Sequence, residues 1–255
     1  MKVYRKPRTK RVFKQGSNPW GLLPYPKTST VASAGCGLVS ITHLALEISK
    51  YADATPETFY NFMVKYAVQG HGTEWVGIDK GMEYLGLTDI KRVSNIRDMY
   101  KEMAKGDRVA VFLFGNEHAP NGILWTSGGH YIAAVGYKVG KRHYFYTKDS
   151  GFRNHDGWYS YERSMKGTIK QMWVGKLPPE TITLPERGYF QFGDQGEEVK
   201  KIQRFLKKHG YFKGSIGGHY RRLTKRAVER FQSENGLKID GLFGVECLKA
   251  YNKYA

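Results

Sequence analysis

The stretch "TVASAGCGLVSITHLAL", residues 30–46, places Cys36 between two glycines at the start of an apolar run. Apolar residues recur at helical spacing as far as Ile48, so the sequence predicts a helix that begins close to Cys36. At a helix N-terminus, free backbone N–H groups and the helix dipole lower the pKa of a thiol. The flanking Gly35 and Gly37 would let another backbone approach the sulfur. Cys36 is therefore a candidate nucleophile; the alternatives are a buried structural thiol and a metal ligand.

The spacing of cysteines and histidines argues against a metal site. The chain has two cysteines, Cys36 and Cys247, and contains neither a CxxC nor an HExxH motif. We therefore expect no metal and no cofactor. Because the two cysteines lie far apart in the sequence, we expect free thiols and a reducing compartment rather than a disulfide framework.

Length, composition and charge limit the class of protein. The 255 residues, 40% of them apolar, suffice for one medium domain and one small domain. No apolar run approaches the roughly 18 residues that a membrane-spanning helix needs. The basic N-terminus, "MKVYRKPRTKRVFKQG", lacks the apolar core and cleavage site of a secretory signal, so we expect the protein to stay in the cytosol until something else releases it. The net charge of +18 implies a polyanionic partner, which could be nucleic acid, anionic lipid or an anionic cell wall.

Pattern changes along the chain predict two domains. Helical patterns at about 37–50, 56–68, 75–85 and 95–104 precede strand-like runs at "RVAVFLF", "GHYIAAVGY", "RHYFYTKD" and "IKQMWVG". Helices followed by strands favour an α+β domain. The proline-rich string "KLPPETITLPERG" reads as a linker. We therefore predict an α+β domain at 1–177, a linker at 178–188 and a small domain at 189–255.

The small domain contains a short internal repeat. An amphipathic helix over "GEEVKKIQRFLKKHGYF" ends at Gly210. The segments 217–228 and 240–251 then align, matching Gly218 with Gly241 and Tyr220 with Phe243. Each copy is a glycine-containing turn that enters a helix, so the sequence predicts a compact three-helix module.

A base for Cys36 is offered by His130, which opens a predicted strand after a Ser-Gly-Gly turn. If the following turn is centred between Val139 and Gly140, paired residues have numbers that sum to 279, and His130 faces Asp149. Opposed side chains on one sheet face lie about 5 Å apart, within reach of a hydrogen bond between carboxylate and imidazole. Such a bond leaves the other ring nitrogen free for the thiol proton. A shift of one residue in the turn would separate the two.

Acyl transfer also needs an oxyanion hole, for which the upstream candidates are Gln15 and Thr30. Among the other histidines, we expect His43 to be a partly buried helical residue. We expect these to be solvated: His71, His118, His143 and His155. His209 and His219 belong to the small domain.

The motifs "QGSNPW", "TVASAGCGLVSITHLAL", "GTEWVGIDKGMEYLGL", "GGHYIAAVGY" and "YTKDSG" resemble the papain-like cysteine peptidases of the bacteriocin-leader-processing type, particularly the stand-alone branch of cell-wall lysins. The resemblance spans about 13–175 and implies a papain-like α+β fold. It also implies that Cys36 is the nucleophile, His130 the general base and later acid, Asp149 the orienting residue and Gln15 the oxyanion donor.

Two features depart from that family pattern. Many relatives have Pro-Thr-Ser after the GCG, where this chain has Leu38-Val39-Ser40. The papain spacing would place the oxyanion glutamine six residues before the cysteine, where this chain has Thr30. Both Gln15 and Thr30 therefore remain candidates.

The C-terminal part resembles the peptidoglycan-binding type 1 domain over 190–253, through "FGDQGEEVKKIQRFLKKHGYF" and "TKRAVERFQSENGLKIDGLFG". That family usually has threonine where Cys247 stands, so Cys247 is interpreted as a packing substitute. Arg221 replaces a glycine of the first repeat, which predicts an altered turn.

Together the resemblances imply a phage endolysin that crosses the membrane through holin-made holes and hydrolyses an amide bond in stem peptides or cross-bridges of Gram-positive peptidoglycan. An N-acetylmuramoyl-L-alanine amidase with the same site is the alternative within enzymes. A non-catalytic protein that binds cell wall or nucleic acid is the alternative from another class. Charge and basic-aromatic strings such as "RHYFY" are its only support, since no nucleic-acid-binding motif occurs.

Overall fold

The computed structural model describes residues 1–255 except 27, 69–71, 152 and 255. The chain divides into two compact units, unit 1 at Met1–Pro178 and unit 2 at Pro179–Ala255. The buried apolar residues form separate clusters in the two units. Among the described residues, no helix is both long enough and apolar enough to cross a membrane.

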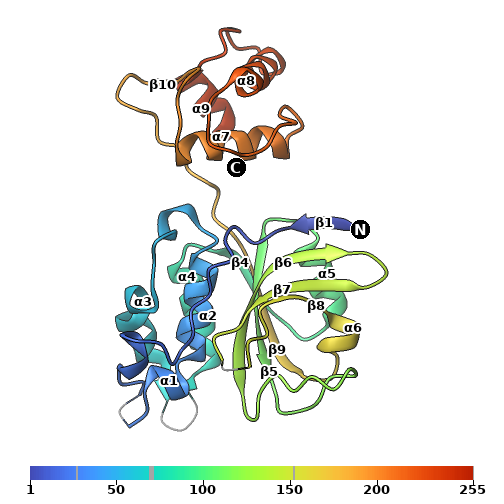
Figure 1. Cartoon of the computed structure of the whole chain (residues 1–255). Coiled ribbons are helices and arrows are strands. Elements are labelled where there is room, and N and C mark those ends of the chain that lie inside the picture. Colours follow the sequence, from blue (N-terminus) through green and yellow to red (C-terminus); the bar gives the residue numbers. More distant parts are fainter. Residues whose placement is uncertain (27, 69–71, 152, 255) are drawn as a thin grey trace. The chain divides into compact units, whose positions relative to one another are not determined.

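Unit 1 is an α+β unit, which confirms the predicted fold class (Figure 1). Its helices are α1 (Val31–Ala34), α2 (Cys36–Ala45), α3 (Pro56–Met63), α4 (Trp75–Tyr84), α5 (Ile96–Met103) and α6 (Tyr161–Ser164), with 3-10 helices at Trp20–Leu22, Ser49–Tyr51 and Val64–Tyr66. Its strands are β1 (Lys2–Arg5), β2 (Ala67–Val68), β3 (Gly72–Thr73), β4 (Thr88–Val93), β5 (Arg108–Phe114), β6 (His130–Val139), β7 (His143–Lys148), β8 (Gly157–Ser160) and β9 (Ile169–Lys176).

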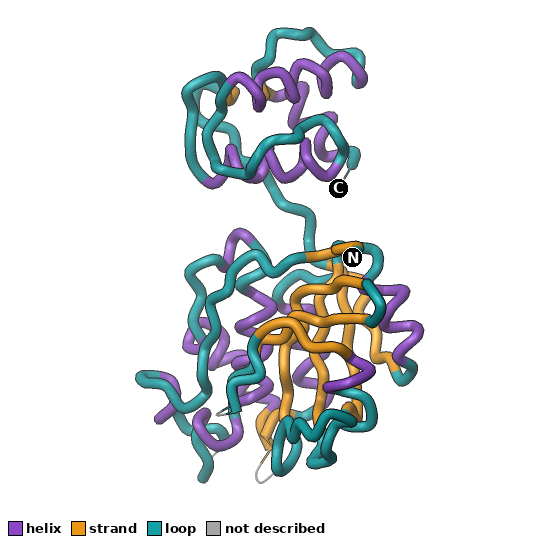
Figure 2. The backbone as a smooth tube through the Cα atoms, turned by 45° about the vertical axis from the view of Figure 1, so that its right-hand side comes forward, coloured by secondary structure: helices purple, strands orange, loops and turns teal. Residues whose placement is uncertain are grey.

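The main sheet of unit 1 is antiparallel, with strand order β4-β9-β5-β6-β7-β8 and with β1 paired to the last residues of β6. Figure 2 shows helices on both sides of this sheet. Successive side chains of a strand point to opposite faces, so β5 contributes to two cores. Val109 and Val111 join the core on the α2 side, whereas Phe112 and Phe114 join the core that contains Met99 of α5.

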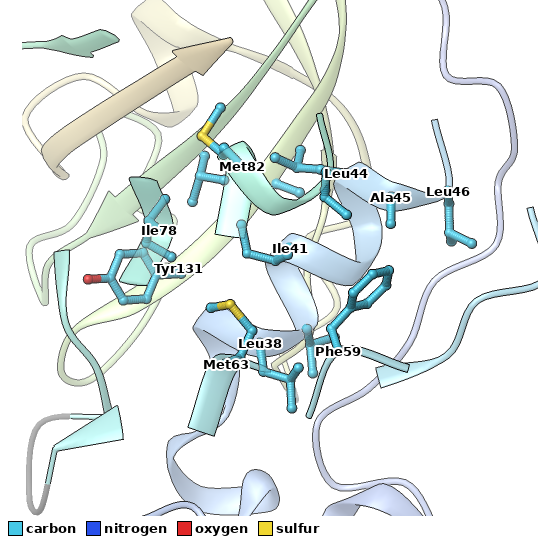
Figure 3. Packing of buried hydrophobic residues seen from close by; sticks show 14 of the residues in the cluster. Leu38, Ile41, Leu44, Ala45, Leu46, Phe59, Met63, Ile78, Met82 and Tyr131 are labelled. Carbon is cyan, nitrogen blue, oxygen red and sulfur yellow. The ribbon is translucent and has the colours of Figure 1, made fainter. Parts of the chain in front are cut away.

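Helix α2 is buried along its whole length, which explains the continuous apolar run that follows Cys36. Leu38, Ile41 and Leu44 pack among Phe59 of α3 and Met82 of α4 (Figure 3). Truncating one such leucine to alanine typically costs about 2–5 kcal/mol. The helix therefore gives its first residue, Cys36, a rigid support.

Some predicted boundaries are wrong. The helix predicted at 37–50 ends at Ala45, where the backbone tightens: Glu47 N donates to Leu44 O. The helix predicted at 56–68 ends at Met63 and continues as a 3-10 turn. Strands β4 and β8 were not predicted, because each has only one fully buried residue and neither shows a sustained apolar pattern.

Unit 2 contains the helices α7 (Glu197–Lys208), α8 (Arg222–Glu234) and α9 (Val245–Asn252) and a ribbon of β10 (Tyr189–Phe190) with β11 (Phe243–Gly244). The predicted three-helix module is confirmed. Its two repeats have matching turns, since Gly218 and Gly241 take φ values of +74° and +70°, a region that favours glycine. Tyr220 and Phe243, which follow these turns, are completely buried.

Two features of unit 2 depart from the sequence interpretation. Arg221, at φ −102° and ψ −177°, matches its repeat partner Gly244, at φ −104° and ψ −161°, so the turn is not altered. Part of the segment 178–188, expected as a linker, packs on unit 2. Its Ile182 is buried in the core of that unit, and Lys201 Nζ donates to Thr181 O at 2.8 Å.

Candidate active site

Cys36 is the first residue of α2, as predicted, and is only 9% exposed. Burial raises the pKa of its thiol, but the hydrogen bond and charge of His130 and the backbone N–H groups of Tyr131 and Gly37 outweigh burial and lower it. Of the described residues, Cys36 and Cys247 are both free thiols. The surroundings of Cys36 therefore favour the thiolate.

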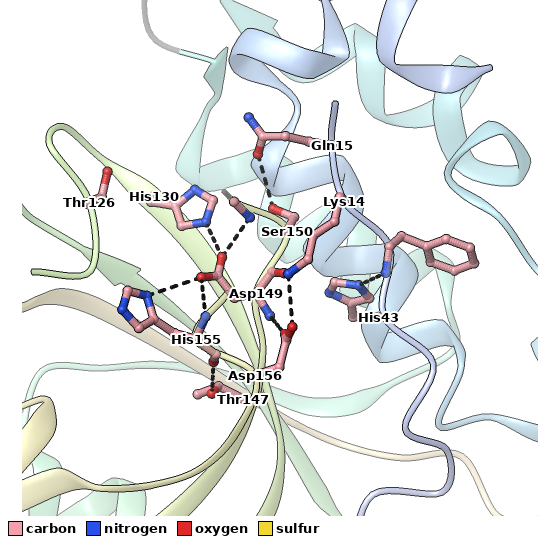
Figure 4. A network of polar contacts seen from close by, with 12 residues as sticks. Lys14, Gln15, His43, Thr126, His130, Thr147, Asp149, Ser150, His155 and Asp156 are labelled. Carbon is pink, nitrogen blue, oxygen red and sulfur yellow. Dashed lines mark hydrogen bonds and ion pairs between the residues drawn. The ribbon is translucent and has the colours of Figure 1, made fainter. Parts of the chain in front are cut away.

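His130 is hydrogen-bonded to both Cys36 and Asp149, and Figure 4 shows its contact with Asp149. Its Nε2 lies 2.8 Å from Asp149 Oδ1, which leaves Nδ1 as the nitrogen that can face the thiol. Burial lowers the pKa of His130, but hydrogen bonds with Asp149 and Cys36 raise it to about 9. Burial likewise opposes ionisation of Asp149, yet hydrogen bonds from His130 and His155 hold its pKa well below the ordinary range. The lowered pKa of Cys36 and the raised pKa of His130 are both shifts in the direction of a thiolate–imidazolium pair.

The predicted contact between His130 and Asp149 is present, but the register that predicted it is wrong. Strands β6 and β7 pair as Ala133↔Lys148 and Val139↔His143, with an irregularity between them, because the turn extends over 140–142. Asp149 lies one residue beyond the end of β7. It reaches His130 from the strand end, not as a directly opposed residue.

Several groups missed by sequence reasoning hold Asp149 in place. Its Oδ1 accepts from Gly151 N at 2.7 Å, and its Oδ2 accepts from His155 N at 3.0 Å. Asp149 N donates to Asp156 Oδ1 at 2.7 Å, while Lys14 Nζ donates to both Asp149 O and Asp156 Oδ2 (Figure 4). No spacing rule predicts the contact of Lys14 with Asp149, because the two residues lie far apart in the sequence.

Gln15 lies close to this group and Thr30 does not contact it. Gln15 is buried; its Oε1 accepts from Ser150 Oγ at 3.1 Å, and its Nε2 donates one hydrogen to Ala32 O at 2.7 Å (Figure 4). Nε2 carries a second hydrogen that can serve another acceptor. Thr30 instead caps α1 in a capping box with Ser33. Of the two oxyanion candidates, Gln15 thus lies beside Ser150, the neighbour of Asp149, and Thr30 lies at the cap of α1.

Gly35 and Gly37, expected to open the sulfur to another backbone, have a reason in the packing of unit 1 itself. A Cβ on Gly37 would lie 2.3 Å from Thr73 Oγ1, and a Cβ on Gly35 would lie 2.6 Å from Val31 Cγ1. Both glycines are therefore required by close packing within unit 1.

The remaining histidines of unit 1 differ from expectation in three cases. His143 is not solvated, because its Nδ1 lies 2.8 Å from Glu162 Oε1 and its ring stacks on Tyr100. His43 is completely buried and accepts a hydrogen bond from Phe13 N at 2.8 Å, while burial and the charge of Lys148 hold its pKa well below the ordinary value. His155 is not solvated: its side chain is 13% exposed, and its Nδ1 lies 3.3 Å from Asp149 Oδ2. His71 lies outside the described residues.

The arrangement can perform nucleophilic chemistry with a thiolate, an imidazolium and an orienting carboxylate. Metal ligation is a separate matter. Within the described part of the chain, no three side chains of His, Cys, Asp or Glu are grouped so that they could hold a metal ion.

Known proteins resemble the chain in short segments. A spore cortex-lytic enzyme of Bacillus subtilis (strain 168) is 40% identical over 68 residues, which are 26% of this chain and 22% of that enzyme. The N-acetylmuramoyl-L-alanine amidase CwlM of Mycobacterium tuberculosis is 36% identical over 64 residues, 24% of this chain and 16% of the amidase. The chain thus spans less than a quarter of the length of either protein.

Two solved structures are also similar. The SleB N-terminal domain is 33% identical, with a TM-score of 0.26, over 26% of this chain and 90% of that one. The peptidase domain of Streptococcus ComA, a bi-functional ABC transporter involved in a quorum sensing pathway, is 13% identical, with a TM-score of 0.40, over 57% of this chain and 93% of that one.

Two family models match the chain. Residues 195–250 match the one described as "Putative peptidoglycan binding domain", so a peptidoglycan-binding domain follows the α+β unit. Residues 24–175, more than half of the chain, match the Peptidase_C39 like family. The chain therefore belongs to the Peptidase_C39 like family.

Proposed function

We propose that this protein is a peptidoglycan hydrolase that cleaves an amide bond in stem peptides or cross-bridges of a Gram-positive cell wall. The observation that carries the proposal is the hydrogen-bonded series of Cys36, His130 and Asp149 at the N-terminus of α2. The peptidoglycan-binding domain on the same chain supports the choice of substrate.

The reaction begins with attack of the Cys36 thiolate on the carbonyl carbon of the scissile amide. The negative charge that develops on the carbonyl oxygen is stabilised by the N–H of Cys36 and the second Nε2 hydrogen of Gln15. His130, as imidazolium, protonates the leaving amine, and the C–N bond breaks to give a thioester on Cys36. Asp149 keeps the ring oriented and stabilises its positive charge.

Hydrolysis of the thioester completes the cycle. His130, now neutral, takes a proton from a water molecule as the water attacks the thioester carbonyl. The carboxylic acid product leaves, and the thiolate–imidazolium pair is restored.

Unit 2 would hold the enzyme on its polymeric substrate. The net charge of +18 favours anionic wall polymers as additional partners. We also propose that the enzyme acts as a phage endolysin, released from the host cytoplasm through holin-made holes. Co-expression with and without a holin tests this part, because lysis from within should require the holin.

Digestion of purified Gram-positive walls tests the reaction. The wild-type protein should clear the suspension and Cys36→Ala should not, and mass spectrometry should find new amino termini inside the peptide. A free stem peptide with N-terminal alanine would instead identify an N-acetylmuramoyl-L-alanine amidase. Co-sedimentation with walls in the absence of any cleavage would identify a binding protein, and clearing by Cys36→Ala would exclude the thiol mechanism.

A further inference from the structure

Unit 1 contains a completely buried ion pair that the proposed reaction does not use. Lys148 Nζ lies 3.1 Å from Glu47 Oε1, and both side chains are 0% exposed. The other carboxylate oxygen of Glu47 accepts from Arg5 Nη2 at 2.9 Å and from Arg8 N at 2.7 Å. The Glu47 carboxylate, just after α2, therefore contacts the N-terminal segment through Arg5 and Arg8 and strand β7 through Lys148.

The two partners occupy special places in the chain. Lys148 is the last residue of β7 and immediately precedes Asp149. Glu47 lies just after α2, the helix whose first residue is Cys36. The pair thus connects the helix that carries the thiol to the strand end that carries the orienting carboxylate.

Stability alone gives a weak reason for such a pair. Removing two charges from water is costly, and apolar side chains of similar volume are often at least as stabilising in a protein interior. Burial indeed lowers the pKa of Lys148, and the Arg5 charge acts in the same direction, while Glu47 and Asp156 oppose them. In some proteins, buried ionic groups are instead retained because they make one arrangement of the chain more specific.

Strand pairing does not replace this restraint at Asp149. The ladder between β6 and β7 ends at Lys148, which pairs with Ala133, and the register shifts within the ladder. Asp149 must nevertheless remain 2.8 Å from His130. Lys14 and Asp156 hold the backbone of Asp149 itself, and the Lys148 side chain adds a contact with Glu47, just after α2.

We propose that the Glu47–Lys148 ion pair is a positioning device that sets Asp149, and through it His130, in register with Cys36. The proposal rests on the proposed function, because it assumes that His130 promotes ionisation of Cys36. Glu47 and Lys148 touch no reacting atom, so both are positioning residues.

Lys148→Met and the double variant Glu47→Gln/Lys148→Met test the proposal in the full-length protein. The glutamine retains an oxygen that can accept from Arg8 N. Arg108→Met is the matched control, because Arg108 is also buried and paired, with Asp89, but lies at the opposite end of β5 from Phe114, the strand partner of His130. Two quantities are measured for each protein. The first is the rate at which iodoacetamide alkylates Cys36 as a function of pH, followed by peptide mass spectrometry, and the second is the Tm.

In Lys148→Met, the pH midpoint of alkylation should rise by about one unit, so that the rate at acidic pH falls about tenfold. The double variant should recover much of the Tm but keep the shifted midpoint, and Arg108→Met should lower the Tm without moving the midpoint. Three outcomes would overturn the proposal. The alkylation midpoint of Lys148→Met could equal that of the wild-type protein, the double variant could regain the wild-type midpoint, or Arg108→Met could shift the midpoint as much as Lys148→Met does. An ordinary thiol midpoint in the wild-type protein would instead reject the proposed function.

Discussion

The two cysteines of this chain have similar settings and opposite acidities. Cys36 opens α2 and Cys247 lies in the first turn of α9, and both are less than one-tenth exposed. The pKa of Cys36 is lowered, whereas burial raises the pKa of Cys247. A helix N-terminus is thus not sufficient to make a buried thiol acidic.

The partners of the two sulfurs explain the difference. Cys36 faces His130, an imidazole that can carry a positive charge. Cys247 instead receives a hydrogen bond from Gln232 Nε2 at 3.5 Å and donates to Leu242 O at 3.4 Å, and the nearby Asp240 charge disfavours its thiolate. Cys36 is therefore suited to nucleophilic attack, and Cys247 is suited to packing.

Replacing His130 should make Cys36 resemble Cys247 and should have the largest effect. His130→Gln removes the base and the positive charge, so we expect wall hydrolysis to fall roughly 10⁴-fold or more. Iodoacetamide should then label Cys36 at neutral pH as slowly as it labels Cys247. Rapid labelling of Cys36 in His130→Gln would show that the helix terminus alone activates the thiol.

In the wild-type protein, hydrolysis should decline as pH rises through about 9, where His130 loses its proton.

Asp149→Asn should have the next largest effect, because an amide can stabilise the wrong His130 tautomer; we expect roughly a 10³-fold loss of hydrolysis. The pKa of Asp149 is lowered on folding, so its charge stabilises the fold above the ordinary carboxylate range. This contribution declines progressively as pH falls below about 4, toward the much lower pKa of the native carboxyl. The Tm difference between the wild type and Asp149→Asn should therefore be larger at pH 7 than at pH 3. An equal difference at both pH values would contradict the stabilising role of the charge.

The sequence was most informative where structure is local. Gly218 and Gly241 were recognised from one repeat, and both take positive φ, because a turn depends on few neighbouring residues. Cys36 was placed at a helix start by the periodicity that follows it, and α2 begins there.

Contacts between distant segments were predicted less well. The His130–Asp149 contact was expected from a hairpin register that proved wrong, since the length of a turn decides pairing and local sequence specifies it poorly. Lys14 and Asp156, which hold the backbone of Asp149, carried no signal at all. The place of Lys14 depends on the N-terminal segment lying beside the end of β7.

Gln15→Ala should have a smaller effect on the reaction, because the N–H of Cys36 remains as an oxyanion donor. We expect a loss of roughly 10²-fold in kcat, with little change in the alkylation rate of Cys36. Thr30→Ala is the control, since Thr30 caps α1 and should affect stability by about 1 kcal/mol but kcat only slightly. A larger loss of kcat in Thr30→Ala than in Gln15→Ala would reverse the assignment of the oxyanion donor.

Cys247→Thr should have the smallest effect and tests the other side of the comparison between the two thiols. The site is only 3% exposed, but Gln232 Nε2 and Leu242 O can bond a hydroxyl as they bond the thiol, so we expect a change of less than about 1 kcal/mol in stability. Cys247→Val removes these hydrogen bonds at similar volume and should be less stable than Cys247→Thr. Thermal unfolding measures the stability of the two variants, and wall hydrolysis by each variant should equal that of the wild-type protein. Loss of hydrolysis in Cys247→Thr at an unchanged Tm would mean that this thiol also takes part in the reaction.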